Sequence, residues 1–217
     1  MMDRENRKEI SECMRCGTCC RKGGPAFHLE DMRLIEDGTI SASDLCTIRE
    51  GEPVYDNVKG VRYPSPSDII RLKQKNGSAA CPLFREEDRE CSIYRLRPVE
   101  CRTLQCWNTA GIEALYAVDR LTRRDLLSGM KEIWEAVSDH QKKCDYGRIL
   151  PLSKSTAISP EVAEMVRFDI YLRELMVEKG GVDPDLLEFL FGKPLTETLQ
   201  RCGIHLEFIS AGAGSNG

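Results

Sequence analysis

The 217-residue chain is poor in aromatic residues and long apolar runs, and each shortage excludes a class of protein. Aromatic residues make up 6% of the chain, too few to predict a base-stacking surface for nucleic acid. Basic residues number 31 against 35 acidic ones, so the net charge of −4 does not attract polyanions either. No segment approaches the roughly 20 apolar residues of a membrane span. We therefore expect neither nucleic acid nor a membrane as a partner.

Several sequence patterns are also missing. The first residues, MMDRENRKEI, are charged and contain no signal-peptide core, which indicates a cytoplasmic location. No G-x-G-x-x-G follows an expected strand, so no Rossmann-type cofactor site is visible. The C-x3-C-x2-C arrangement that radical enzymes use is absent as well. Thiols stay reduced in the cytoplasm, so abundant cysteine there indicates metal binding or catalysis rather than disulfides.

Cysteine is what the chain has in excess, with 11 thiols, nine of which lie in the first half. Eight of them form two clusters and are the predicted metal ligands: Cys13, Cys16, Cys19, Cys20, Cys81, Cys91, Cys101 and Cys106. Spacing of two residues lets one chain turn wrap around a metal, and Gly17 permits the positive φ that such turns often need. Adjacent Cys19 and Cys20 project in different directions, so we expect only one of them to ligate a single ion.

The spacing of the thiols bears on the choice of cofactor. C-x2-C-x2-C with a remote Cys-Pro, here Cys81-Pro82, is typical of bacterial ferredoxins and favours an iron–sulfur cluster. Zinc ribbons instead pair two C-x2-C knuckles, and no second knuckle follows Cys20. An iron–sulfur cluster is therefore the preferred cofactor and zinc the alternative. The spacing leaves the number of centres open.

The other cysteines have other expected roles. Cys46 and Cys202 stand alone in apolar surroundings and are expected to be packing residues. Cys144 follows His140 by four residues on an expected helix, so the two form either a zinc-type pair or part of the core.

Histidines and basic residues add little to the ligand set. His28 and His205 are expected to be ordinary surface or core residues. Basic residues near the thiols either offset the charge of a thiolate-ligated centre or form a solvated face paired with acidic neighbours. These residues are Arg15, Arg21, Lys22, Arg95, Arg97 and Arg102.

The first half of the chain predicts short elements. Helical periodicity indicates a helix over residues 28–36, stopped by Gly38, and a second one that Ser43 or Asp44 caps. Strand-like stretches follow at 53–55, 69–72, 79–84 and 91–94, with the polar residues 86–90 as a hairpin turn. They predict a small antiparallel unit. Cys81 and Cys91 would then lie on neighbouring strands and converge.

The second half predicts helices. Thr122 and Asp125 form a capping box, after which apolar residues continue at helical spacing to Val137. Ser159-Pro160 starts a helix that ends at Gly180-Gly181, and shorter helices are expected over 183–190 and 194–200. The fold class is thus α+β and mostly helical. Residues 1–110 form a metal-binding region, residues 111–210 a helical region packed on it, and residues 211–217 a disordered tail.

Two motifs together resemble a known family. The motifs are Cys13-x2-Cys16-Gly-x-Cys19-Cys20-Arg21 and, later, Cys91-Ser-Ile-Tyr94-x2-Arg97-Pro98-x2-Cys101-Arg102. In this order they resemble the YkgJ-type cysteine-cluster proteins, described as zinc- or iron-chelating CxxCxxCC domains, and the cluster region of flagellin lysine N-methylases. The resemblance covers residues 13–106 and implies metal or iron–sulfur binding.

Two functions follow from these observations. The first is a cytoplasmic metal-centre protein with an unknown protein partner or substrate, in which loss of the metal unfolds the N-terminal half. The alternative is a protein lysine methyltransferase that uses S-adenosylmethionine, implied only by the similarity to the flagellin enzymes. A thiol redox role for Cys13 and Cys16 ranks lower, because no βαβ unit surrounds them.

Overall fold

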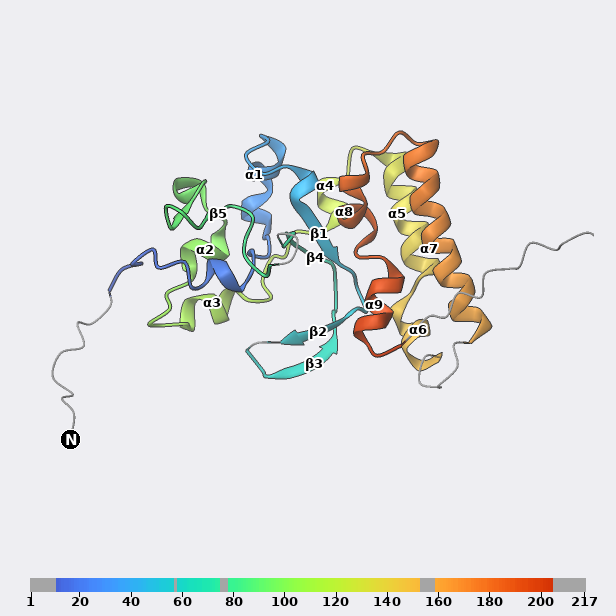
Figure 1. The fold of residues 1–217 in the computed structure, drawn as a ribbon, viewed down its shortest axis with the longest axis horizontal. Coiled ribbons are helices and arrows are strands. Elements are labelled where there is room, and N and C mark those ends of the chain that lie inside the picture. Colours follow the sequence, from blue (N-terminus) through green and yellow to red (C-terminus); the bar gives the residue numbers. More distant parts are fainter. Residues whose placement is uncertain (1–10, 57, 75–77, 153–158, 205–217) are drawn as a thin grey trace, which may run out of the picture.

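The computed structural model describes residues 11–56, 58–74, 78–152 and 159–204. Figure 1 shows the cysteine-rich segments and several short helices at one end, short strands in the middle and the longest helices at the other end. Helices and antiparallel strand pairs occupy different parts of the chain, which confirms the predicted α+β class. No helix within the described ranges is long and apolar enough to span a bilayer.

The first elements of the described chain are short helices. They are η1 (Cys20–Lys22), η2 (Leu29–Asp31), α1 (Met32–Glu36) and η3 (Ala42–Asp44). Gly38 has a φ of 75° just beyond α1, which confirms the predicted stop. The predicted cap of the next helix is wrong by two residues. Ser41 caps η3 by accepting a hydrogen bond from the Ser43 N–H at 3.3 Å, because a strand already begins at Leu45.

The strands form three antiparallel pairs. They are β1 (Leu45–Ile48) with β4 (Ile69–Leu72), β2 (Pro53–Asp56) with β3 (Val61–Pro64), and β5 (Phe84–Arg85) with β6 (Glu90–Cys91). The hairpin across residues 86–90 is confirmed, but its strands are much shorter than predicted. The Phe84 N–H donates to the Cys81 carbonyl in a turn, and η4 (Tyr94–Leu96) follows β6, so neither 79–83 nor 92–94 is extended strand. The sequence analysis did not predict β1 or β3.

Helices make up most of the second half. They are α2 (Val99–Thr103), α3 (Ala110–Leu115), α4 (Arg123–Leu126), α5 (Lys131–Lys143), α6 (Tyr146–Leu152), α7 (Pro160–Glu178), η5 (Pro184–Leu186), α8 (Leu187–Phe191) and α9 (Leu195–Arg201). Ser159 caps α7 by accepting from the Val162 N–H, as predicted. The capping box is also confirmed, since the Thr122 N–H donates to Asp125 at 2.9 Å. The tail at 211–217 lies outside the described residues.

The single helix predicted from Thr122 to Val137 is wrong. The chain leaves the helix after Leu126 and re-enters it at Lys131, so α4 and α5 are separate. Met130, just before α5, has φ −118° and ψ 72°, outside the helical region. Gly129 lies in the break, where a helix would lose about 1 kcal/mol relative to alanine. Apolar residues recur at helical spacing on both sides of this turn, so their periodicity did not reveal the break.

The largest apolar core draws on both halves of the chain. Phe27, Leu45 and Leu72 from the first half are fully buried with Leu121 and Phe191 from the second. The strand β1 lies against α8, where the Thr47 hydroxyl donates to the Phe189 carbonyl at 2.6 Å. This core fixes the strand pair on which the cysteine-rich segments rest.

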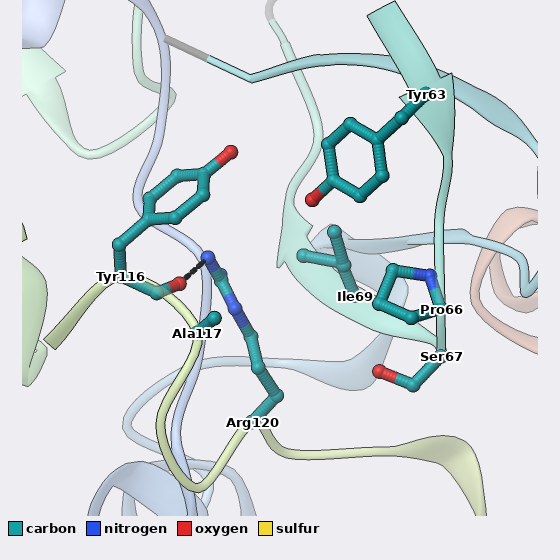
Figure 2. A pocket seen from close by; sticks show the side chains of 7 residues that line it. All are labelled: Tyr63, Pro66, Ser67, Ile69, Tyr116, Ala117 and Arg120. Atoms are coloured by element: carbon teal, nitrogen blue, oxygen red, sulfur yellow. Dashed lines mark hydrogen bonds between the residues drawn. The ribbon is translucent and has the colours of Figure 1, made fainter. Parts of the chain in front are cut away.

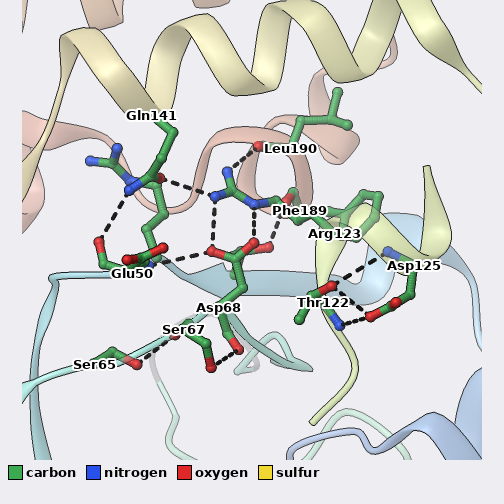
Figure 3. A network of polar contacts seen from close by, with 12 residues as sticks. Glu50, Ser65, Ser67, Asp68, Thr122, Arg123, Asp125, Gln141, Phe189 and Leu190 are labelled. Carbon is green, nitrogen blue, oxygen red and sulfur yellow. Dashed lines mark hydrogen bonds and ion pairs between the residues drawn. The ribbon is translucent and has the colours of Figure 1, made fainter. Parts of the chain in front are cut away.

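A buried ion pair joins the halves as well (Figure 3). Arg123, at the start of α4, donates to both carboxylate oxygens of Asp68 at 2.7 and 2.9 Å. Its remaining donors reach the Leu190 carbonyl at 2.8 Å and the Gln141 side chain at 3.0 Å. Only 2% of the Arg123 side chain is exposed, so the loop before β4 is held firmly against α4, α5 and α8.

Candidate metal centre

The first cysteine cluster is a tight turn with its thiols near the surface. Gly17 is buried with a φ of 76°, and η1 begins at Cys20. The Arg21 N–H closes the turn by donating to the Gly17 carbonyl at 2.9 Å. Cys13, Cys16 and Cys19 are exposed, whereas Cys20 is half-buried. The positive φ expected of Gly17 is therefore confirmed.

The second cluster comes from a turn, a short strand and a helix. Cys81 is buried in the turn before β5, and Cys91 pairs with Phe84 across the β5–β6 hairpin. The half-buried Cys101 lies in α2. The prediction that Cys81 lies on a strand is thus wrong, although its turn leads directly into β5. Cys106 is exposed beyond the end of α2.

Direct contacts join the two clusters. The Cys81 N–H donates to the Cys20 carbonyl at 2.7 Å, and the Gly17 Cα lies against the ring of Phe84. Arg21 donates to Glu86 through Nε at 2.9 Å and Nη2 at 2.7 Å, and its Nη1 donates to the Cys16 carbonyl at 3.0 Å. The turn that carries the first thiols is therefore packed on the segment that carries the second.

Six thiols from the two clusters interact electrostatically. Burial raises the pKa of Cys101, and negative charge on Cys81, Cys91 and Cys19 raises it further. The hydrogen bond with Cys19 raises the pKa of Cys20, to which burial, Cys81 and Cys101 add. Cys16 also interacts with Cys19, while its contact with the Thr18 hydroxyl lowers its own pKa. The raised pKa values keep Cys20 and Cys101 protonated without a metal, so a metal that binds them would have to displace their protons.

The adjacent thiols Cys19 and Cys20 do not diverge as predicted. Their sulfur atoms lie 4.0 Å apart, because Cys19 has helical backbone angles immediately before η1. The hydrogen bond from Cys20 lowers the pKa of Cys19 to about 6, and the positive charge of Arg97 acts in the same direction. Both sulfurs consequently face the same site.

The structure does not assemble all eight predicted ligands. Within the described ranges no hydrogen bond or ion pair joins Cys13 or Cys106 to another thiol, and no three candidate ligands are close enough to hold one ion. The eight-residue ligand set stays a prediction. Its sulfur-only donors suit zinc or an iron–sulfur cluster, and six of them already share one electrostatic environment.

The remaining cysteines differ in environment. Cys46 is buried in β1, as predicted. Cys202 is exposed after α9, so its predicted role in packing is wrong. Cys144 is fully buried and donates to the Met165 carbonyl, which places it in the core.

The histidines have partners of their own. His140 is fully buried, with Nε2 2.7 Å from Asp169, so it does not form a metal pair with Cys144. His28 is buried near the Val118 carbonyl and Glu100, which confirms an ordinary core role. His205 lies outside the described residues.

Several basic residues near the thiols are paired with acids. Arg102 contacts Glu30 at 2.6 Å and Arg15 contacts Glu90 at 4.0 Å, in addition to the pair between Arg21 and Glu86. These are exposed contacts that stabilise the fold only weakly. The reading as a face paired with acids therefore holds for Arg15, Arg21 and Arg102, whereas the charge of Arg97 lowers the pKa of Cys19.

Two aromatic residues that contact the cysteine-bearing segments were not among the predicted site residues. Phe84 supports Gly17, and Tyr94 contacts both Arg15 and Arg97. Each aromatic residue follows a cysteine of the second cluster by three positions in a chain that has few aromatics. This three-residue spacing between a cysteine and an aromatic residue was the signal in the sequence that could have identified them.

Two pockets among the described residues have no cysteine in their lining. Tyr63, Tyr116 and Arg120 line a small one of about 50 Å³, where Arg120 donates to the Tyr116 carbonyl (Figure 2). Arg120 also contacts Glu100 at 3.3 Å, next to Cys101 in α2. A larger pocket of about 310 Å³ lies beside the pair of Arg123 and Asp68. The thiols are thus the chemically distinctive site of the described chain.

Replacing Gly17 by alanine is expected to weaken metal binding. The new Cβ would lie 2.3 Å from the Phe84 ring at a φ that alanine rarely adopts. Strain and overpacking together cost about 2–4 kcal/mol, which predicts at least a tenfold lower metal affinity in competition with a chelator. Gly38→Ala is the matched control, because Gly38 has a φ of 75° and open space around it. Equal metal affinity of the two variants would refute the role of Gly17.

Comparison with known proteins agrees with this site. A family model described as "CxxCxxCC: Putative zinc- or iron-chelating domain" matches residues 12–120. A curated protein of Acinetobacter calcoaceticus named "Putative ferredoxin" is 28% identical over 94 residues, which are 43% of this chain and 63% of that protein. No solved structure matches. The expected similarity to flagellin lysine N-methylases and the methyltransferase alternative gain no support.

The family model matches the same part of the chain that carries the cysteine clusters. The matched residues contain both cysteine clusters, the β5–β6 hairpin and α2. The match extends over half of the chain. The chain belongs to the CxxCxxCC family of zinc- or iron-chelating domains and is a metal-binding protein.

Proposed function

We propose that this protein holds an iron–sulfur cluster through its clustered cysteines and uses it to transfer electrons. The observation that carries the proposal is the contact between two distant cysteine-bearing segments, which the hydrogen bond from the Cys81 N–H to the Cys20 carbonyl joins. The ligands are drawn from Cys13, Cys16, Cys19, Cys20, Cys81, Cys91, Cys101 and Cys106. The metal-binding region then spans residues 1–110, with residues 111–210 packed on it.

Three observations support iron and sulfide. The first cluster has the C-x2-C-x2-C spacing of bacterial ferredoxins, and Cys81 precedes a proline. The nearby donors are sulfur atoms, which suit iron–sulfur clusters. A relative that shares 94 aligned residues carries the name of a ferredoxin, and the chain spans 63% of that relative's length.

The surrounding residues would tune such a cluster. An iron–sulfur cluster supplies a reversible one-electron couple whose potential depends on charge, hydrogen bonds and solvent exposure. Arg97 places a positive charge near Cys19, which favours the thiolate form of that ligand. Cys16 and Cys19 are exposed, so a partner protein can approach the centre closely. We propose a protein redox partner and a cytoplasmic setting that keeps the thiols reduced.

One distance favours zinc as the second candidate. Neighbouring sulfurs on a zinc ion with bonds of about 2.3 Å are about 3.8 Å apart at the tetrahedral angle. The 4.0 Å between the Cys19 and Cys20 sulfurs is close to that value. A structural zinc site would stabilise the same junction between the clusters without electron transfer.

Anaerobic purification distinguishes the two cofactors. We expect brown protein that contains iron and acid-labile sulfide, and a change in visible absorption together with an electron paramagnetic resonance signal on reduction with dithionite. Colourless protein that contains zinc and shows no response to dithionite would overturn electron transfer. Protein without any metal after anaerobic reconstitution would overturn the ligand assignment.

A further inference from the structure

One aromatic ring connects the two cysteine clusters. The guanidinium carbon of Arg15 lies 4.2 Å from the centre of the Tyr94 ring, and that of Arg97 lies 3.8 Å from the same centre. Both distances are well inside the range of a cation–π contact. Arg15 stands between Cys13 and Cys16, whereas Tyr94 and Arg97 stand between Cys91 and Cys101. The ring therefore bridges two segments that are about 80 residues apart in sequence.

The backbone of Arg15 is placed for this contact. Its φ of 52° lies in the left-handed region, which residues with a Cβ adopt only where the surrounding structure compensates. Glycine would fit this backbone without strain, and yet the chain has arginine there. The stacking on Tyr94 and the 4.0 Å contact with Glu90 are the interactions that this conformation gains.

Arg97, the second arginine of this contact, is held in place by its neighbours. Arg97 stacks on the ring of Tyr94 and its Nε also donates to the Tyr94 carbonyl at 2.9 Å. Pro98 follows at once and restricts the backbone of Arg97 to an extended conformation, with φ −55° and ψ 141°. Tyr94 and Arg97 consequently form a preformed surface on which Arg15 can dock.

We propose that Tyr94 is a positioning residue that, between Arg15 and Arg97, fixes the first cysteine turn against the thiols of the second cluster. The assignment rests on the proposed metal centre, although the contact itself is made by protein side chains alone. Two cation–π contacts together are worth about a tenfold change in an equilibrium constant. The bidentate ion pair of Arg21 and Glu86 joins the same two segments at another point and does not involve Tyr94.

The test compares Tyr94→Leu with Tyr94→Phe, which retains the ring face. Amide hydrogen exchange of the protein as purified, without chelator, is followed at the N–H of Arg21, in the first turn, and at the N–H of Cys81, which bonds to Cys20. Both amides are expected to exchange about tenfold faster in Tyr94→Leu and at the wild-type rate in Tyr94→Phe. Amides of α7 should be unchanged in both variants. Wild-type exchange at both sites in Tyr94→Leu would overturn the proposal.

Anaerobic titration with Co²⁺ adds a readout of the assembled ligands. The cobalt–thiolate absorption should appear in all three proteins, with about tenfold weaker binding in Tyr94→Leu alone. If wild-type protein lacks this absorption, the ligand assignment fails, and the exchange rates of the purified variants still decide the role of Tyr94.

A second variant keeps the proposal testable if Tyr94→Leu does not fold. Arg15→Gly relieves the positive φ and removes one half of the stack. If Arg15 mattered only through its strained backbone, glycine would relieve that strain and slow exchange at the Arg21 N–H. If its contact with Tyr94 holds the turn, loss of that contact should accelerate the exchange about threefold. Slower or unchanged exchange in Arg15→Gly would contradict the proposal.

Discussion

Removing the metal is expected to unfold residues 11–25 and 78–106 while the longest helices stay folded. Structural zinc contributes about 10–16 kcal/mol in small metal domains, against about 1.5–3 kcal/mol for one buried apolar side chain. Among the described residues of the second segment, the buried apolar side chains are Ala80, Cys81, Phe84 and Val99. Cys81 and Phe84 belong to the apolar core that also contains Phe191, but β5 and β6 have only two residues each and offer few backbone hydrogen bonds. Without the metal, the entropy of the unfolded chain should therefore outweigh the remaining contacts of these segments.

The structure thus limits the expected unfolding to these two segments, whereas the sequence predicted that the whole N-terminal half unfolds. The strands β1 and β4 are held in the shared core and by the ion pair of Asp68 and Arg123, which need no metal. Limited proteolysis with trypsin after chelation should cut at Arg21 and Arg95 and spare α7. Cys16→Ser should produce the same pattern without chelator, whereas Cys202→Ser, at another exposed thiol, should not. An unchanged pattern after complete metal removal would show that the metal does not stabilise these segments.

Asp68→Ala is expected to lower the free energy of unfolding by about 3–5 kcal/mol. The substitution leaves the buried guanidinium of Arg123 without its carboxylate, and an unpaired buried charge is far more costly than the loss of an exposed pair. The contacts with Leu190 and Gln141 keep the guanidinium in place, so it cannot turn toward water easily. Urea unfolding followed by circular dichroism measures the change.

The matched control is Asp139→Ala. Asp139 pairs with Lys143 at 2.9 Å on α5, but about half of each side chain is exposed. Its removal should cost less than about 1 kcal/mol. Equal losses in the two variants would mean that Arg123 finds another partner and that the ion pair does not join the halves of the chain.

Local signals in the sequence were reliable where the structure depends on neighbouring residues. The capping box of Thr122 and Asp125 and the cap at Ser159 are both present, because a cap needs only the next three residues. Gly17 and Gly38 adopt the positive φ expected of them. The grouping of thiols into two clusters was also visible, since its evidence is spacing alone.

Tertiary contacts decided the features that the sequence did not reveal. Cys81 lies in a turn rather than a strand, because its N–H bonds to Cys20 from the first cluster. Cys19 and Cys20 face each other, because a 3-10 turn starts at Cys20. Cys202 is exposed although packing was predicted for it, since α9 ends just before it and Arg201 and Gly203 flank it. None of these facts can be read from composition or periodicity.

The most direct test of the central claim is thiol footprinting of the metal-loaded protein by alkylation and mass spectrometry. If the two cysteine clusters form one centre, six thiols from both should be protected together and become reactive together on chelation. These are Cys16, Cys19, Cys20, Cys81, Cys91 and Cys101, while Cys202 should react in both states. Protection or release confined to one cluster would contradict a shared metal centre.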